Sequence, residues 1–166
     1  DADARRLGDI NERVQRASAR NVQILGGGDE NMLAPLQGRM DLVLVDAPCA
    51  GTGTWRRRPD AKWRITENAL QERHRDQMQA LALAAPLVKP GGRLVYVTCS
   101  VLPSENDGRI DDFLEANSTF RPVPAAELLA TLPGLHAAAR ITRQGVLLTP
   151  AKAGTDGFYV AMLRRD

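Results

Sequence analysis

Apolar residues recur along the chain with the spacing of helices in three segments. In residues 4–20 this helical spacing is formed by Leu7, Ile10, Val14 and Ala17. A second helix is predicted over residues 66–87, with Thr66 as its N-cap, and a third over residues 104–116. All three are long enough to pack against a sheet.

Between these helices lie short, continuous apolar runs that predict strands. Residues 41–46 form one such run between two aspartates, and residues 93–98 form another after the Lys-Pro-Gly-Gly turn. Runs that are apolar on both faces are typical of parallel strands inside a sheet. A shorter strand is predicted at residues 22–25, and the final strands at residues 146–148 and 158–163 are predicted to form an antiparallel hairpin.

This alternation of strands and helices predicts a single α/β domain, residues 1–166, with an open, mainly parallel sheet. In such sheets, ligands bind beyond the carboxyl ends of the strands. Three predicted strands end in polar or reactive residues, and we expect these ends to meet in one crevice. They are Gly28-Asp29, Asp46-Ala-Pro-Cys49 and Thr98-Cys99-Ser100.

Composition narrows the class of protein. The chain is 43% hydrophobic and 25% charged, and it contains no apolar run long enough to span a bilayer and no signal peptide. Its two cysteines are too few for a disulfide framework, so we expect reduced thiols and a cytoplasmic location. The lack of a spanning run leads us to expect no membrane partner. His74 and His136 lack partners at metal-ligand spacing, so we also expect no metal.

Basic residues cluster after the first cysteine. The candidates for contact with nucleic-acid phosphates are Arg56, Arg57, Arg58 and Lys62. A solvated loop is the alternative interpretation, but the position of the cluster beside the Cys49 segment favours phosphate contact. For Trp63, packing of this loop against the domain is expected more than stacking on a base.

The two thiols, fifty positions apart, allow three interpretations. Each thiol can be a small buried hydrophobe, the two can form a redox pair, or they can serve covalent catalysis. The C-x-x-C spacing of redox pairs is absent. The segment Asp46-Ala-Pro-Cys49-Ala-Gly-Thr-Gly53 sets a carboxylate, a rigid proline and glycines beside one thiol, which favours catalysis.

These segments resemble, in order, the motifs of the Sun/Nop family of RNA cytosine-5 methyltransferases. Residues 46–53 resemble the fourth motif and Tyr96-Val-Thr-Cys99-Ser100 resembles the sixth. The resemblance extends to Arg57-Arg-Pro-Asp-Ala-Lys-Trp63, residues 77–83, Lys89-Pro-Gly-Gly92, Val101-Leu-Pro-Ser-Glu-Asn106 and Asp156-Gly-Phe-Tyr-Val-Ala161. It implies a Rossmann-like class I methyltransferase domain that uses S-adenosyl-L-methionine to make 5-methylcytosine in RNA, with ribosomal RNA as the expected substrate.

The resemblance also implies roles for three residues of the site. Cys99 would be the nucleophile that attacks carbon 6 of cytosine, and Cys49 would assist release of the product. Asp46 would hydrogen-bond the N3 edge of the ring. DNA cytosine-5 enzymes use the fourth-motif cysteine as the nucleophile, which makes Cys49 the competitor for this role, but the Thr-Cys-Ser sequence is of the RNA type.

For the cofactor, the resemblance implies Asp1, Asp29 and Asp46, with Asp3 as the alternative to Asp1. The family's first motif, a glycine-rich loop after the first strand, is not in this sequence, so we expect an N-terminally truncated catalytic domain. Two other functions stay open. An amino-group methyltransferase has the same fold but carries Asp/Asn-Pro-Pro-aromatic in the fourth motif, and a domain without its glycine-rich loop could be a non-catalytic RNA-binding module.

Overall fold

The computed structural model describes residues 7–25, 30–130 and 134–166, and the chain divides into two compact units, Asp1–Gln37 and Gly38–Asp166. The described part of the first unit holds α1 (Ile10–Arg16) and the 3-10 helix η2 (Glu30–Leu36). Helix α1 is shorter than the predicted helix, because Ser18 adopts a left-handed conformation with φ of 51° just beyond its end. The strand predicted at residues 22–25 is wrong: these residues are irregular, and the described part of this unit contains no strand with which they could pair.

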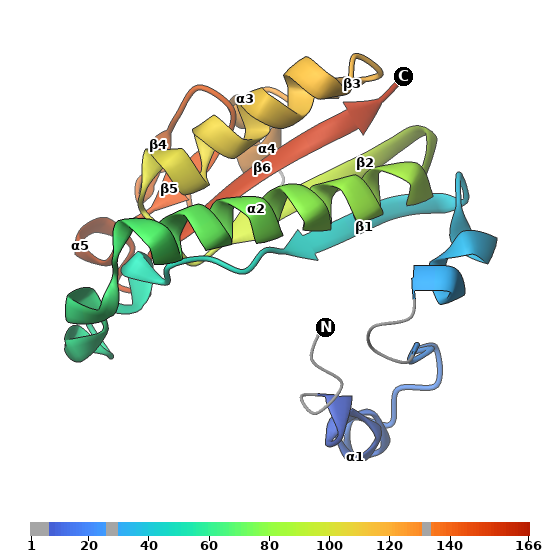
Figure 1. Ribbon diagram of the computed structural model, residues 1–166, viewed down its shortest axis with the longest axis horizontal. Coiled ribbons are helices and arrows are strands. Elements are labelled where there is room, and N and C mark those ends of the chain that lie inside the picture. The colour runs from blue at the N-terminus through green and yellow to red at the C-terminus, as the bar shows by residue number, and fades with distance from the viewer. Residues whose placement is uncertain (1–6, 26–29, 131–133) are drawn as a thin grey trace. The chain divides into compact units, whose positions relative to one another are not determined.

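The second unit is built on a six-stranded sheet with the order β1-β2-β6-β5-β4, in which β3 also pairs with β6 (Figure 1). The strands are β1 (Met40–Asp46), β2 (Val88–Thr98), β3 (Phe120–Pro122), β4 (Ala139–Ile141), β5 (Val146–Leu148) and β6 (Phe158–Arg165).

Strand pairing changes from parallel to antiparallel across this sheet. The β1–β2 pair is parallel, with Asp46 opposite Val97. The other described pairs are antiparallel, and they include the predicted β5–β6 hairpin, in which Val146 lies opposite Val160. Strand β2 begins earlier than predicted, because the Lys-Pro-Gly-Gly turn is absorbed as an irregularity between the Met40–Val88 and Leu42–Arg93 pairs. The α/β fold expected from the sequence is confirmed, but the described sheet is mainly antiparallel rather than mainly parallel, because among its described pairs only β1–β2 is parallel.

Helices cover both faces of the sheet. The predicted helix after Thr66 is confirmed as α2 (Glu67–Ala84), and the Thr66 side chain caps it by accepting a hydrogen bond from the Ala69 N–H at 3.2 Å. The helix predicted over residues 104–116 is divided into η6 (Pro103–Glu105) and α3 (Asp107–Ala116). The remaining helices are η3 (Thr52–Thr54), η4 (Pro59–Arg64), η5 (Ala85–Leu87), α4 (Ala125–Ala130) and α5 (Pro150–Ala153).

The main core lies between the sheet and the face formed by α2 and α3. Its fully buried members include Leu81 of α2, Leu94 and Tyr96 of β2, and Ile110 of α3. Burial of a side chain such as Leu81 stabilises the fold by about 1.5–3 kcal/mol. On the opposite face, α4 supplies Leu128 and Leu129 to a smaller cluster with Val146, and Figure 1 shows α4 behind β6.

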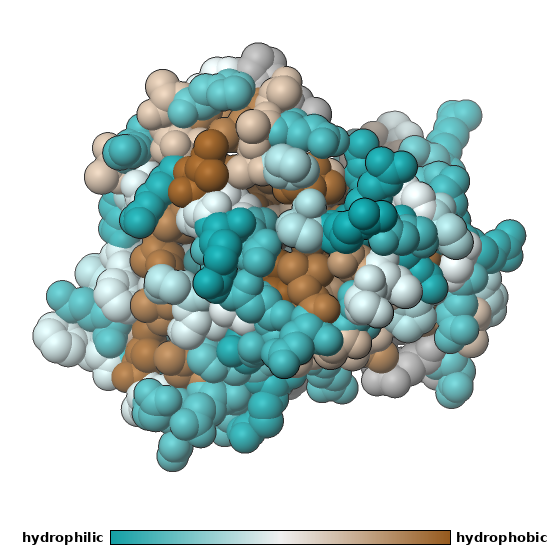
Figure 2. All heavy atoms as spheres, turned by 90° about the horizontal axis from the view of Figure 1, so that it is seen from above, coloured by the Kyte–Doolittle hydropathy of each residue, from teal (hydrophilic) through white to brown (hydrophobic). Residues whose placement is uncertain are grey.

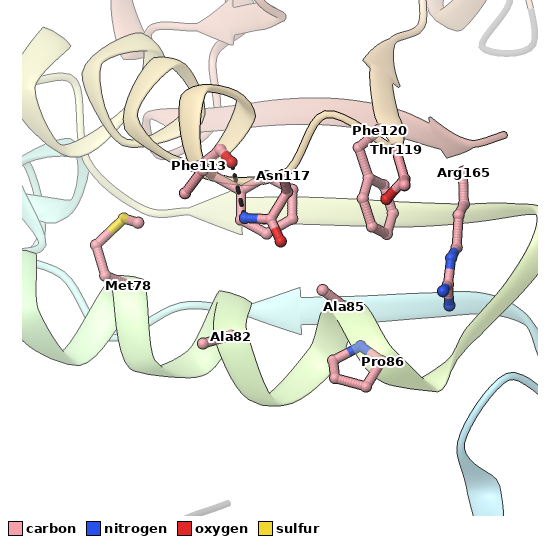
Figure 3. Close-up of a pocket in the computed structure, with 10 residues that line it drawn as sticks. Met78, Ala82, Ala85, Pro86, Phe113, Asn117, Thr119, Phe120 and Arg165 are labelled. Atoms are coloured by element: carbon pink, nitrogen blue, oxygen red, sulfur yellow. Dashed lines mark hydrogen bonds between the residues drawn. The ribbon is translucent and has the colours of Figure 1, made fainter.

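A groove between α2 and α3 lies away from the two cysteines. Met78, Ala82 and Ala85 line one side of it, and Phe113 and Phe120 line the other (Figure 3). In the space-filling view, hydrophobic patches are separated by hydrophilic side chains (Figure 2). Among the helices that the structure describes, none combines the length and apolar character needed to cross a membrane.

Candidate active site

The two cysteines lie together beyond the ends of neighbouring parallel strands. Cys49 follows the end of β1 by three residues, and Cys99 directly follows β2. Their Sγ atoms are 3.4 Å apart, and both side chains are half-buried. The predicted convergence of these two strand ends is therefore present in the structure.

The close contact gives the two thiols opposite acidities. The hydrogen bond between them is the largest cause, and it lowers the pKa of Cys99 to about 7, although burial acts in the opposite direction. The same hydrogen bond, together with burial, raises the pKa of Cys49 far above its ordinary value. The contact therefore favours ionisation of one thiol of the pair, and the direction of the shifts makes Cys99 the more acidic of the two.

Backbone and hydroxyl hydrogen bonds join the loop after β1 to the loop after β2. The Gly53 N–H donates to the Cys99 carbonyl at 2.9 Å. The buried hydroxyls of Thr52 and Ser100 lie 3.0 Å apart, and the Val101 N–H donates to Thr52 Oγ1 at 2.8 Å. Because each loop supplies partners to the other, the two cysteines are held as parts of one structure.

Asp46 is the last residue of β1, and its side chain is exposed. It lies opposite Val97, two residues before Cys99, and its negative charge acts to raise the pKa of that thiol. Asp1 and Asp29, the other two acids expected at the cofactor, lie outside the described residues, as does Asp3. The structure thus brings Asp46, Cys49 and Cys99 to one region.

The basic cluster follows η3 and continues into η4, with all four candidate side chains exposed. The Arg57 Nε donates to Asp156 Oδ2 at 2.7 Å, its Nη2 donates to the same carboxylate, and Arg56 lies 4.0 Å from Asp156. Arg58 has no ion pair among the described residues, and the Lys62 ammonium lies 4.6 Å from the centre of the Trp63 ring. Arg57 is thus partly neutralised within the protein, while Arg58 and Lys62 keep their charge available.

The expectation that Trp63 packs the loop against the domain is wrong. Its side chain is 80% exposed. The reason is its position in η4, a short 3-10 helix on the surface in which no described residue is buried. One face of the Trp63 ring is covered by the Lys62 side chain and not by residues of the core.

Two buried polar residues near the site, Gln77 and Asn106, were not predicted from the sequence as more than parts of motifs. The position of a third, Glu105, at the start of a predicted helix favours equally an influence on the Cys99 loop and a plain N-terminal acid. A signal for Gln77 exists in the sequence. It falls on the stripe of α2 that also carries Leu70, Leu81 and Ala84, where an apolar residue is expected. A polar side chain on an apolar stripe indicates a buried hydrogen-bond partner.

The fold and the position of these residues at the carboxyl ends of β1 and β2 define a Rossmann-like methyltransferase. The chain belongs to the family described as 16S rRNA methyltransferase RsmB/F, whose model matches residues 1–164.

Named relatives agree with this assignment. Ribosomal RNA small subunit methyltransferase B of Erwinia tasmaniensis is 35% identical over 163 residues, which cover 98% of this chain and 35% of that protein. The protein of the same name from Thermus thermophilus is 36% identical over 162 residues, which cover 95% of this chain and 38% of that protein. The chain therefore spans about a third of the length of the curated relatives it matches.

Solved structures share the fold over almost the whole chain. The crystal structure of PH0851 matches with a TM-score of 0.83 at 32% identity and covers 99% of this chain and 36% of that one. NSun6 from Pyrococcus horikoshii, solved with SFG, matches with a TM-score of 0.75 at 25% identity and covers 99% of this chain and 40% of that one.

Proposed function

We propose that the protein forms 5-methylcytosine in ribosomal RNA, with Cys99 as the nucleophile and S-adenosyl-L-methionine as the methyl donor. Membership of an rRNA methyltransferase family supports the substrate class. The observation that carries the proposal is the 3.4 Å contact between Cys49 Sγ and Cys99 Sγ at the ends of two parallel strands. Two thiols in contact with unequal acidity suit a reaction that needs a nucleophile and a separate proton carrier.

The reaction needs a thiolate because carbon 5 of cytosine is too weak a nucleophile by itself. Addition of the Cys99 thiolate to carbon 6 forms a carbon–sulfur bond and moves an electron pair towards carbon 5 and N3. With its pKa near 7, about half of Cys99 is ionised at neutral pH. We assign Asp46 to the N3 edge of the ring, where a hydrogen bond from its carboxyl group stabilises the charge that develops during addition.

S-adenosyl-L-methionine, when bound, supplies the methyl group that carbon 5 takes. We assign its binding to Asp1, Asp29 and Asp46. The side-chain chemistry fits at Asp46, whose exposed carboxyl group forms no ion pair within the described ranges and keeps an oxygen that can accept a hydrogen bond from the cofactor while its O–H donates to N3 of the ring. The presence of SFG, an analogue of this cofactor, in the matching NSun6 structure supports the choice of cofactor.

After methyl transfer, carbon 5 must lose its proton before Cys99 can leave. The pKa of Cys49 is high chiefly because its proton is shared with Cys99, and burial and the charge of Cys99 also raise it. Once Cys99 is bonded to carbon 6, it carries no charge, and the half-buried Cys49 releases its own proton to solvent water more easily. The resulting Cys49 thiolate accepts the proton from carbon 5, the double bond re-forms, and the Cys99 thiolate is expelled.

Nucleoside analysis tests this proposal. The full-length protein and, in parallel, residues 1–166 are incubated with unmethylated small-subunit ribosomal RNA and isotopically labelled S-adenosyl-L-methionine, and the digested RNA is analysed by mass spectrometry; the result with the full-length protein decides the function. We expect labelled 5-methylcytosine. Labelled N4-methylcytosine would instead identify an amino-group methyltransferase, and RNA binding without any labelled nucleoside would identify a binding module.

A further inference from the structure

Two buried polar side chains form hydrogen bonds with the backbone of the loop that carries Cys49. Gln77 and Glu105 are both 0% exposed, although one lies in the middle of α2 and the other at the end of η6. The Ala50 N–H donates to Glu105 Oε1 at 2.8 Å, and the Gln77 amide donates to the Pro48 carbonyl at 2.9 Å. The peptide groups on both sides of Cys49 are therefore held from the core.

The side-chain amide of Gln77 also binds Glu105 directly. Gln77 Nε2 also donates to Glu105 Oε1, at 3.1 Å. The backbone carbonyl of Glu105 accepts a hydrogen bond from the buried Tyr96 hydroxyl at 2.8 Å, which fixes η6 to strand β2. Gln77 and Glu105 are thus anchored to β2, the strand that ends directly before Cys99.

The next residue in the chain holds the other cysteine loop. The side chain of Asn106 donates from Nδ2 to the Ser100 carbonyl at 3.0 Å and accepts from the Thr98 hydroxyl at 2.7 Å. Thr98 and Ser100 are the neighbours of Cys99 on either side. Consecutive residues, Glu105 and Asn106, therefore bind the loops of different cysteines.

We propose that Gln77, Glu105 and Asn106 are positioning residues that hold Cys49 and Cys99 at hydrogen-bonding distance. Their consequence for catalysis rests on the proposed function, whereas the contact between the thiols does not. Burial of these groups is costly, since each loses water, and Gln77 Oε1 and Glu105 Oε2 find no hydrogen-bond partner among the described residues. Apolar side chains would fill the same space at a lower cost, and what the polar ones add is their bonds to the two loops.

Alkylation of Cys99 as a function of pH measures the sulfur contact directly. Pulses of iodoacetamide at a series of pH values, followed by peptide mass spectrometry, give the midpoint at which Cys99 becomes reactive. The titratable or charged groups that act on this thiol are Cys49, Asp46 and Glu105, and Arg57 also interacts with it. In the unaltered protein we expect a midpoint near pH 7, because the Cys49 hydrogen bond lowers the pKa of Cys99 to about 7.

Gln77→Met removes the amide while keeping the length of the side chain and the charge of the site. We expect the Cys99 midpoint to rise above about 8, because the released Cys49 loop no longer holds a donor against the thiolate. An unchanged midpoint in folded protein would overturn the proposal. If Gln77→Met does not fold, Gln77→Asn, which shortens the amide by one methylene, carries the same expectation.

Two further variants separate positioning from a general structural role. Glu105→Gln keeps an oxygen that accepts from Ala50 and removes a charge that raises the pKa of Cys99, so its midpoint should stay at or below that of the unaltered protein. Asp107→Asn is the matched control. Asp107 begins α3 and accepts hydrogen bonds from Thr142 and Tyr159, each at 2.8 Å, rather than from either cysteine loop. Asp107→Asn should lower the melting temperature and leave the midpoint in place, and a shift as large as that of Gln77→Met would overturn the proposal.

Alkylation requires neither RNA nor a methyl donor, so this test is independent of the proposed function. The expected midpoints in a protein that makes no 5-methylcytosine would support positioning and reject the function. Unaltered midpoints in a protein that makes 5-methylcytosine through Cys99 would reject positioning and retain the function.

Discussion

Gly53 and Gly157 meet backbone to backbone. The Gly157 N–H donates to the Gly53 carbonyl at 2.8 Å, and a Cβ placed on Gly53 would lie 2.3 Å from the carbonyl oxygen of Gly157. Since Gly53 also donates to the Cys99 carbonyl, this contact connects the turn before β6 to both cysteine loops. The close approach explains why a glycine is needed at each position.

We expect Gly53→Ala to destabilise the protein by about 1–3 kcal/mol, because the added methyl group meets a backbone that cannot rotate away. The melting temperature measured by calorimetry reports this loss. Gly108→Ala in α3 is the control, since its Cβ would lie 3.3 Å from the Pro103 carbonyl oxygen and alanine favours the helix. Equal losses for the two variants would contradict the role of the glycine contact.

The two cysteine variants should fail at different steps. Cys99→Ala should abolish methylation, since the carbon 6 adduct cannot form. Cys49→Ala should still form the adduct and transfer the methyl group, but release is slowed, so a covalent protein–RNA complex should accumulate on denaturing gels.

The opposite pattern, with RNA trapped by Cys99→Ala, would exchange the roles of the thiols. Methylation by both variants without any adduct would mean that covalent catalysis is wrong. Asp107→Asn serves as the control, because it alters a partly buried hydrogen-bond network without touching either cysteine loop.

The acidity of Cys99 should depend on the donor at position 49. In the unaltered protein, alkylation of Cys99 should increase as the pH rises through about 7, because the thiolate is the reactive form. Cys49→Ala removes the hydrogen bond that lowers this pKa, so the midpoint should move upward towards the ordinary thiol value of about 8.5. Cys49→Ser retains a donor and should stay closer to 7; identical midpoints for the alanine and serine variants would reject this explanation.

The basic residues should contribute unequally to RNA binding. Arg58→Ala or Lys62→Ala should each flatten the slope of log affinity against log salt by roughly 0.7, the value for one phosphate contact on a single strand. Arg57→Ala should change the slope less, because Asp156 already neutralises this side chain. Binding to an RNA oligonucleotide is measured by fluorescence anisotropy at several salt concentrations.

Lys152→Ala, in the last turn of α5, is the control for the salt experiment. It removes one positive charge outside the cluster and should leave the slope unchanged. If the control and the cluster variants flatten the slope equally, the effect is one of net charge and the solvated-loop interpretation of residues 56–62 holds.

Local patterns predicted the parts of the fold that depend on nearby residues. The apolar run at residues 41–46 and the Thr66 cap each act over a few positions, and the corresponding elements are present. The rule that parallel strand ends converge was enough to bring Cys49 and Cys99 together. The predicted strand at residues 22–25 failed because a strand exists only with a partner, which its own residues do not specify.

The side-chain contacts that hold the site could not be predicted from local patterns, because they join segments that are distant in the sequence. Gln77 and Glu105 lie 28 positions apart, and Arg57 and Asp156 lie 99 apart. Neither separation is the two to four residues at which side chains on a single strand or helix are neighbours. Trp63 shows the converse, since its large apolar ring suggests burial but its 3-10 helix keeps it on the surface.

Strand β6 has a consequence for the order of events during synthesis. It pairs with β2, β3 and β5 and so occupies the centre of the sheet, although it is synthesised after the other five strands of this sheet. A nascent chain that has reached only residue 150 already carries both thiols, but not Gly157 or the strand that covers one edge of β2. The cysteine loops therefore reach their final arrangement after β6 has been made, and a chain interrupted before that point exposes a reactive thiol pair without its support.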